Sequence, residues 1–218
     1  MRRVAQLIVT LLTTAALVFM LSMSADAVTL VGNGKANTLK GKGGNDTLKG
    51  KGGDDTLKGG AGNDKAYGGG GDDFIHAGTG NDVVVGGNGN DVLKAVDGDD
   101  TVDGGAGHDE LQGGDDNDVL TGGDGNDEMQ GGAGNDRFSD GPGNDRIVGS
   151  EGDDVVVLGT GADRFYGEEG NNTVYVTADG VRDDIYCGEG PNDTIVYVGG
   201  QGDAAIDHVA MCEHVEEQ

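Results

Sequence analysis

Residues 86–94 read GGNGNDVLK and residues 122–130 read GGDGNDEMQ, two nine-residue segments that agree at positions one, two, four, five and six. Residues 41–49, GKGGNDTLK, follow nearly the same pattern. Writing the chain in nines from Gly32 keeps this register without a gap as far as Tyr175, which gives sixteen consecutive repeats. A fixed period of this kind indicates a solenoid, in which each repeat is one supersecondary unit.

Two columns of the repeat carry most of the information. Position eight is apolar in every repeat, and only Ala66 is small. Position six is asparagine at the two ends, Asn37 and Asn172, and aspartate in every repeat between them. These aspartates are Asp46, Asp55, Asp64, Asp73, Asp82, Asp91, Asp100, Asp109, Asp118, Asp127, Asp136, Asp145, Asp154 and Asp163.

The pattern predicts a six-residue turn followed by a three-residue strand centred on position eight. Side chains alternate along a strand, so only position eight should fill a core. Glycines at positions one, two and four permit a positive φ in the turn. Two repeats per coil return the chain to the same side every eighteen residues, and parallel crossovers are right-handed. We therefore expect an all-β fold, a right-handed parallel β-roll (a two-sheet β-solenoid) with eight regular coils.

This coil divides the position-six aspartates into two ladders, one on each side of the roll. Like charges stacked in register repel, and a hard cation that takes about 6–8 oxygen ligands between adjacent turns would relieve the repulsion. Calcium suits such a site better than magnesium, which demands near-octahedral geometry. The alternative is a solenoid whose aspartates only favour turns and solubility.

The chain resembles the RTX, or haemolysin-type, calcium-binding repeat, whose consensus is G-G-x-G-x-D-x-U-x with U large and apolar. The resemblance rests on the position-six and position-eight columns and implies that the fourteen aspartates bind several calcium ions. Departures occur locally: Lys35 and Asp116 replace a position-four glycine, and Asp140 and Leu158 replace a position-one glycine.

The composition agrees with a cation-binding protein. The chain has 46 glycines, no tryptophan and a formal net charge of −26. Without a counterion, such a composition points to disorder. The negative field repels nucleic acid and anionic lipid, which excludes both as partners.

The N-terminus predicts a secretory signal peptide over residues 1–27. Arg2 and Arg3 precede an apolar stretch, and Ala25-Asp26-Ala27 forms a small-x-small cleavage site. The alternative is a retained membrane anchor, because the apolar stretch approaches the ~20 residues of a spanning helix. With the signal removed, we expect a secreted or cell-surface protein without stable membrane insertion.

The C-terminal segment departs from the regular register. We expect residues 28–175 to form the calcium-binding roll and residues 176–218 to form degenerate repeats with a closing cap. Cys187 and Cys212 are the only cysteines, and in an exported chain they should form a disulfide. The alternative is a thiolate metal site completed by His208 or His214.

No enzyme is expected. The sequence has no H-E-x-x-H or G-x-S-x-G motif, and its four histidines, which include His76 and His108, are scattered. The function that the sequence predicts is extracellular calcium binding with calcium-dependent folding. The alternative is a calcium-stabilised adhesin, or a module that binds a cell-surface polysaccharide through its outer sheet faces. In the second case, the position-nine side chains Lys40, Lys58, His76 and Lys94 would form a basic stripe.

Overall fold

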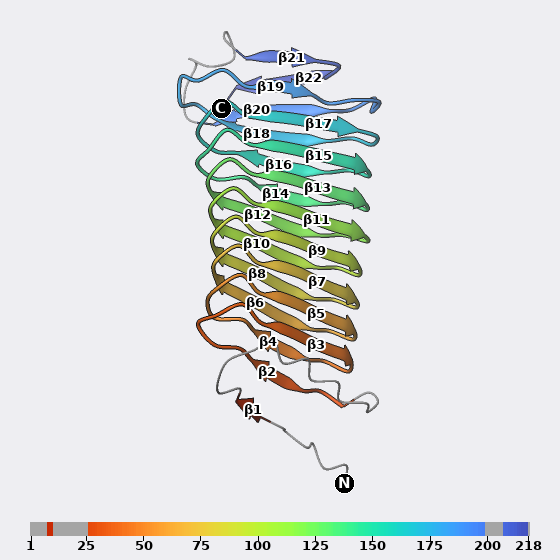
Figure 1. Ribbon diagram of the computed structural model, residues 1–218. Helices are drawn as coiled ribbons and strands as arrows, with labels where there is room; N and C mark the ends of the chain where they lie inside the picture. The colour runs from red at the N-terminus through yellow and green to blue at the C-terminus, as the bar shows by residue number, and fades with distance from the viewer. Residues whose placement is uncertain (1–7, 11–25, 199–206, 218) are drawn as a thin grey trace.

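The computed structural model describes residues 8–10, 26–198 and 207–217, and within them every regular element is a β-strand. The strands stack along one axis from β2 to the pair β21 and β22, which gives an elongated roll (Figure 1). No helix in these described ranges is long and apolar enough to cross a bilayer. Most of the predicted signal peptide, residues 1–7 and 11–25, lies outside the described residues.

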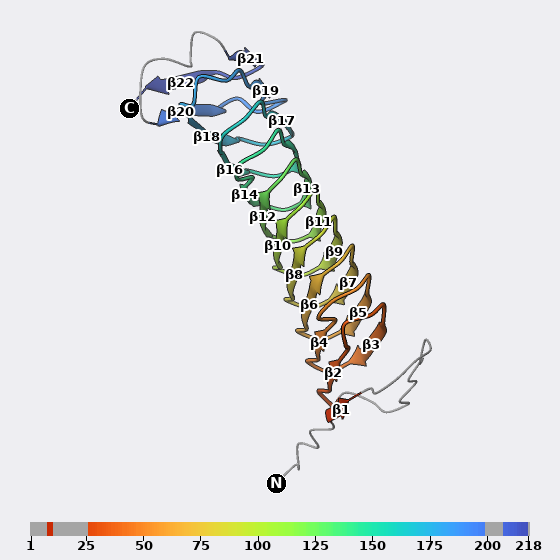
Figure 2. The ribbon, with the colours of Figure 1, turned by 60° about the vertical axis from the view of Figure 1, so that its left-hand side comes forward.

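From β2 onward, odd and even strands separate into two parallel sheets, which form the two layers of the roll in Figure 2. The ten-stranded sheet, called sheet B, contains β3 (Thr38–Gly43), β5 (Thr56–Ala61), β7 (Phe74–Thr79), β9 (Val92–Asp97), β11 (Glu110–Asp115), β13 (Glu128–Ala133), β15 (Arg146–Glu151), β17 (Arg164–Glu168), β19 (Asp184–Tyr186) and β21 (His208–Ala210).

The twelve-stranded sheet, called sheet A, lies opposite. It contains β1 (Ile8–Thr10), β2 (Thr29–Val31), β4 (Thr47–Lys49), β6 (Lys65–Gly70), β8 (Val83–Asn88), β10 (Thr101–Ala106), β12 (Val119–Asp124), β14 (Arg137–Ser139), β16 (Val155–Leu158), β18 (Thr173–Thr177), β20 (Thr194–Val198) and β22 (His214–Glu217).

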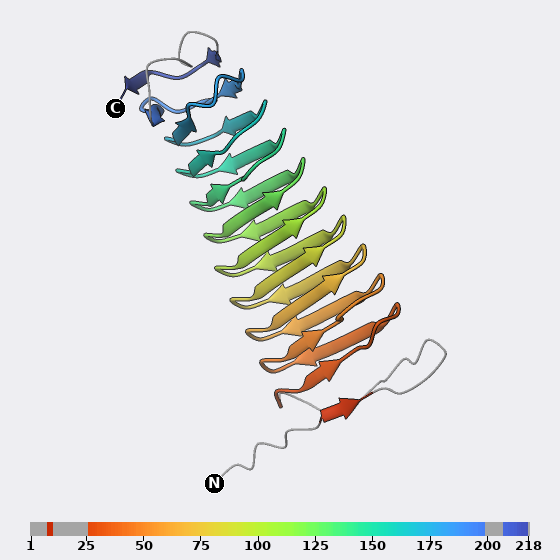
Figure 3. The same cartoon turned by 90° about the vertical axis from the view of Figure 1, so that its left-hand side faces the viewer.

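The strand register follows the predicted period of eighteen residues. In sheet B, Leu93 of β9 pairs with Leu111 of β11, and in sheet A, Val84 of β8 pairs with Val102 of β10. Each coil contributes one strand to each sheet, and consecutive strands run in opposite directions on the two sides of the roll (Figure 3). The predicted parallel two-sheet solenoid is confirmed, and it continues through the degenerate segment as far as β22.

The position-eight column forms the core. Leu48, Leu57 and Leu93 are fully buried, and so is the small Ala66. One buried apolar side chain per repeat accounts for most of the apolar cluster between the sheets.

Two predictions about the strand were wrong. Most strands in the regular region span six residues and not three, because pairing continues through positions two and three of the next repeat. Position eight is also not the only position that fills the core. Position one points inward as well, where Ala77, Ala95, Leu158 and Val176 are fully buried. A glycine at position one therefore adds no side chain to the interior of the coil.

Candidate metal centre

The fourteen predicted aspartates are all buried, with at most 3% of their surface exposed. Each directly precedes a strand, so one ladder lies along each edge of the roll. Asp55 and its equivalents precede strands of sheet B, and Asp46 and its equivalents precede strands of sheet A. The two ladders expected from the sequence are therefore present, with each aspartate one coil from the next.

Backbone amides hold one oxygen of every carboxylate. The N–H of Asp82 donates a 2.6 Å hydrogen bond to Oδ1 of Asp100, and the N–H of Asp91 donates one of 2.8 Å to Oδ1 of Asp109. The same bond, always across one coil, repeats along both ladders. These bonds fix the orientation of the side chains without side-chain cations.

The second oxygen, Oδ2, has no hydrogen-bond partner in any of the fourteen aspartates. In every one of these repeats whose position one is glycine, Oδ2 lies inside the coil beside that glycine. A Cβ on Gly41, for example, would overlap both Asp46 Oδ2 and the carbonyl oxygen of Gly59. Two oxygens without a hydrogen between them thus face the same small space. Such a pair costs free energy unless a proton or a cation joins them.

Asn172 shows how an uncharged side chain occupies the same place. Its Oδ1 accepts the N–H of Asp154 at 3.0 Å, as an aspartate does in the other coils. Its Nδ2, which replaces Oδ2, donates a 3.1 Å hydrogen bond to the carbonyl oxygen of Cys187, the next position-one residue on that edge. The amide therefore donates a hydrogen bond to a carbonyl oxygen, which an ionised aspartate cannot do because it has no hydrogen to donate. In the aspartate coils, by contrast, Oδ2 has no hydrogen-bond partner.

Burial raises the pKa of the ladder carboxyls. It raises the pKa of Asp100 to about 8, against the hydrogen bond from Asp82, and the negative charges of Asp118 and Asp82 add to the rise. The pKa of Asp118 is raised to about 7 and that of Asp136 to about 6, in both cases mainly by burial. The ionised ladder is therefore unfavourable near neutral pH unless cations compensate its charge.

A separate series of hydrogen bonds joins adjacent turns on the outside of the roll. Most position-five side chains are exposed polar groups that accept a hydrogen bond from the backbone N–H one coil further on, the reverse of the direction in the buried ladders. Oδ1 of Asn90 accepts the N–H of His108 at 2.9 Å, and Nδ1 of His108 accepts the N–H of Asn126 at 2.8 Å. His108 therefore has a structural role in the turn.

The buried ladders continue beyond the regular repeats, which the sequence reasoning missed. Oδ1 of Asp183 accepts the N–H of Asp163 at 2.9 Å, and Oδ1 of Asp193 accepts the N–H of Asn172 at 2.7 Å. Asp207 and Glu213 extend the two series by one further step. The spacings of 20, 21, 24 and 20 residues explain why a strict period of nine did not reveal these four acids.

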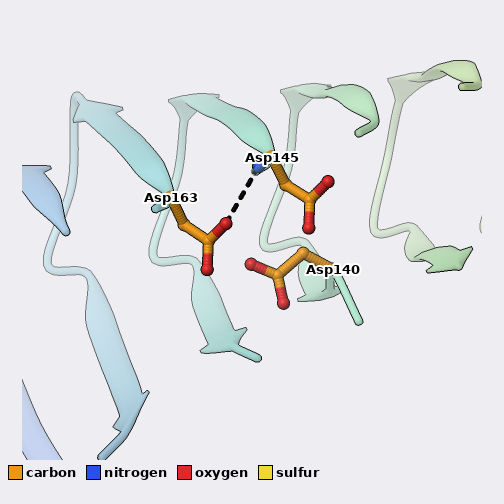
Figure 4. A group of neighbouring side chains, drawn as sticks. All are labelled: Asp140, Asp145 and Asp163. Atoms are coloured by element: carbon orange, nitrogen blue, oxygen red, sulfur yellow. Dashed lines mark hydrogen bonds between the residues drawn. The ribbon is translucent and has the colours of Figure 1, made fainter. Parts of the chain in front are cut away.

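The structure also brings together a third carboxylate that the repeat does not predict. Asp140 occupies position one, and one oxygen from each of Asp140, Asp145 and Asp163 lies within 4.8 Å of the others (Figure 4). The sequence interpretation treated Asp140 only as a departure from the consensus glycine.

The two cysteines are not metal ligands. Cys187 and Cys212 form a disulfide, with 5.2 Å between their Cα atoms. The predicted disulfide is confirmed and the alternative thiolate site is wrong. Of the two histidines that this site would need, His208 contacts Tyr186 edge-on and lies 3.8 Å from an oxygen of Asp184, whereas His214 begins β22.

Comparison with known families gives an independent result. The family model of the RTX calcium-binding nonapeptide repeat (4 copies) matches this chain six times, at residues 31–66, 49–84, 76–111, 85–120, 103–138 and 139–174. Together the matches span residues 31–174 of the 218-residue chain. No curated protein matches the chain.

Proposed function

Because this chain belongs to the RTX calcium-binding nonapeptide repeat family, we propose that its two aspartate ladders bind columns of calcium ions on which folding of the roll depends. The observation that carries the proposal is the contrast between the aspartate coils and Asn172. Oδ2 of an aspartate faces a backbone carbonyl with no hydrogen to share, whereas Nδ2 of Asn172 donates to that carbonyl. A divalent cation binds both kinds of oxygen, which removes the conflict.

The chemistry of the donors favours calcium. Carboxylate and backbone carbonyl oxygens are hard ligands, and calcium accepts about 6–8 of them in irregular geometry. The ligands from the chain would be the position-six aspartates together with the position-one carbonyl oxygens. The unpartnered Oδ2 atoms fit such a group, since buried carboxylate oxygens otherwise require hydrogen-bond donors.

The dependence on calcium follows from the sparse core. Burial of one large apolar side chain per repeat gains less free energy than ordering the backbone of nine residues costs, before strand hydrogen bonds offset part of that cost. The charge of −26 adds repulsion. Binding that occurs only in the folded state would supply the missing free energy.

The location that suits this dependence is outside the cell, where calcium reaches the ~10⁻⁴–10⁻³ M range at which extracellular modules bind it. In this proposal, residues 1–27 act as a signal peptide, residues 28–175 are the calcium-binding roll and residues 176–218 close its end. The chain would cross the membrane unfolded and fold after export. The role is that of a calcium-stabilised scaffold and not of an enzyme.

The test is a calcium titration of chelated protein that lacks residues 1–27, followed by far-UV circular dichroism. A cooperative gain of β signal, with several ions bound per chain in calorimetry, is the expected result. A fully formed roll in excess chelator, or no heat of calcium binding, would refute the proposal. Magnesium at the same concentration serves as the control and should produce less signal.

A second candidate function is docking to an acidic polysaccharide. Lys40, Lys58, His76 and Lys94 are neighbours in register across β3, β5, β7 and β9, so their side chains share one face of sheet B. Three lysines in this row make a local basic stripe on an acidic molecule. Replacing all three lysines by glutamate should abolish retention on an acidic polysaccharide column in calcium. Unchanged retention would rule this function out, without affecting the calcium proposal.

A further inference from the structure

The cluster of Asp140, Asp145 and Asp163 differs from the rest of the ladders. In the other regular repeats, position one is glycine, alanine or leucine, none of which has a side-chain oxygen. Asp140 adds a carboxylate there, and Figure 4 shows the side chains of Asp145 and Asp163 pointing from the other side of the coil toward it. Three formal negative charges thus lie within 4.8 Å inside the protein.

All three carboxylates are buried and each has one oxygen without a partner. Asp140 is 0% exposed, Asp145 2% and Asp163 1%, and Oδ2 of each makes no hydrogen bond. An acidic cluster on a surface would be solvated. Here water does not reach the unpartnered oxygens, so they require a ligand.

The remaining oxygens are held in place by the backbone. Oδ1 of Asp140 accepts two hydrogen bonds, at 2.7 Å from Gly141 N–H and at 2.6 Å from Gly159 N–H. Oδ1 of Asp145 and Oδ1 of Asp163 each accept the ladder bond from the preceding coil. The three Oδ2 atoms are therefore oriented before any ligand binds, which reduces the entropy cost of binding one.

Strand β14 is short beside Asp140. β14 ends at Ser139, directly before Asp140, although its neighbour β12 continues for six residues. The hydrogen bond from Asp140 N–H to the carbonyl of Val157 is 3.4 Å long, and the bond from Thr160 N–H to the carbonyl of Gly141 is 3.2 Å long.

We propose that Asp140, Asp145 and Asp163 form a single calcium site of higher affinity than the repeated ladder sites, and that this site fills first. The inference rests on the proposed calcium function and names the place in the roll where binding begins. Affinity for calcium rises with the number of charged ligands and with the rigidity of the site. The number of charged ligands is greater here than in coils whose position-one residue has no carboxylate, and backbone N–H groups hold Oδ1 of all three side chains.

Calorimetry with calcium tests this assignment on the chelated full chain. The wild-type isotherm should contain one site at least about tenfold tighter than the remainder. Asp140→Gly, which restores the consensus residue, and Asp140→Asn, which keeps the side-chain volume, should both lose that tight site and keep the others. Asp115→Asn is the matched control, since it removes an exposed carboxylate at position three and should leave the tight site intact.

The possible results separate the two proposals. If the wild-type chain binds no calcium, the proposed function fails. If it binds calcium and Asp140→Gly and Asp140→Asn keep the tight site, or if the wild type has no tight site, the calcium function stands and this inference is overturned. Circular dichroism in saturating calcium shows whether each variant has folded, and Asp140→Asn decides the question should Asp140→Gly not fold.

Discussion

The backbone amide of Asp100 donates a 2.8 Å hydrogen bond to Oδ1 of Asp118, one coil further along the roll, while Oδ2 of Asp118 remains buried without a partner. The two oxygens of one carboxylate therefore have different roles. Oδ1 is part of the backbone hydrogen-bond network, and Oδ2 faces the carbonyl oxygen of Gly131. An asparagine in this place would keep the first role and change the second.

We expect Asp118→Asn to affect stability in opposite directions with and without calcium. In chelator, the amide keeps the Oδ1 bond and donates to the Gly131 carbonyl, as Asn172 donates to Cys187, so any residual fold should gain about 1 kcal/mol. In calcium, the variant should be less stable than wild type because a ligand is lost. Thermal melts in both conditions check this, and a loss of stability in chelator would contradict it.

The double variant Asp100→Ala/Asp118→Ala should bind fewer calcium ions. Both residues belong to one ladder and both have an unpartnered Oδ2, so removing them deletes ligands from adjacent coils. Calorimetric stoichiometry is the readout, with Asp115→Asn as the charge control. An unchanged number of ions would count against the ladder assignment.

The stability of the calcium-free roll should fall as pH rises. Burial raises the pKa of Asp100 to about 8, that of Asp118 to about 7 and that of Asp136 to about 6, from an ordinary value of 3.8. The folded state therefore holds protons that the unfolded chain releases. Its stability is greatest below about pH 4 and is lost as pH rises through about 6 to 8.

Calcium should reverse this dependence. Calcium ions and protons compete for the same carboxylates, so calcium affinity should rise between about pH 6 and pH 8. Chemical unfolding at pH 5 and pH 8, with chelator and with saturating calcium, measures both trends. Chelated protein that is more stable at pH 8 than at pH 5 would show that the buried carboxyls do not titrate in this way.

Val96→Gly should stabilise the roll. Val96 occupies position two with a φ of 107°, a conformation that costs a β-branched residue of the order of 1–3 kcal/mol. Glycine removes this strain but gains freedom in the unfolded chain, so we expect a net gain of about 1 kcal/mol, or about 2–4 °C in Tm.

The matched control is Gly114→Ala, at the same position one coil later. Gly114 has a φ of 132°, and a Cβ there would overlap the carbonyl oxygen of Val96. This variant should lower Tm in saturating calcium. If Val96→Gly lowers Tm as well, position two is not strained and the side chain of Val96 contributes to packing.

The position-eight core was predictable from the sequence because a single apolar column leaves no alternative face to bury. Leu93, Leu111 and Met129 follow one another at the predicted interval, and all are buried. The aspartate ladders followed from the same period. The expected strand of three residues is too short. Glycines at positions one and two suggest a turn, but in the structure positions one to three continue the strand.

It was harder to predict that position one points into the core. Most position-one residues are glycines, and without side chains they form no apolar pattern along the sequence. The exceptions to glycine contained the signal: Ala77, Ala95, Leu158 and Val176 are buried apolar residues in the same column, separated by multiples of the nine-residue period. Asp140 belongs to this column too. Its pairing with Asp145 and Asp163 depends on which way position one points, so it required the structure.

The last prediction concerns the disulfide at the end of the roll. Cys187 follows β19 and is fully buried, and Cys212 follows β21, so the bond joins the last two coils of sheet B across a sequence separation of 25 residues. A cross-link of this length stabilises by about 3 kcal/mol, chiefly by restricting the unfolded chain. In a solenoid each coil contacts only its neighbours, so the effect should be local.

We therefore expect reduction, or Cys187→Ala/Cys212→Ala, to speed hydrogen exchange in β19 and β21 while β9 and β11 in saturating calcium keep their protection. The hydrogen bond from Cys187 N–H to the Ala210 carbonyl, at 3.2 Å, should be among the first to open. Reductant added to the double variant controls for effects unrelated to the bond and should change nothing. Equal loss of protection in the central coils would mean that the roll unfolds as one unit, because in that case the closing coils would transmit their stability along its whole length.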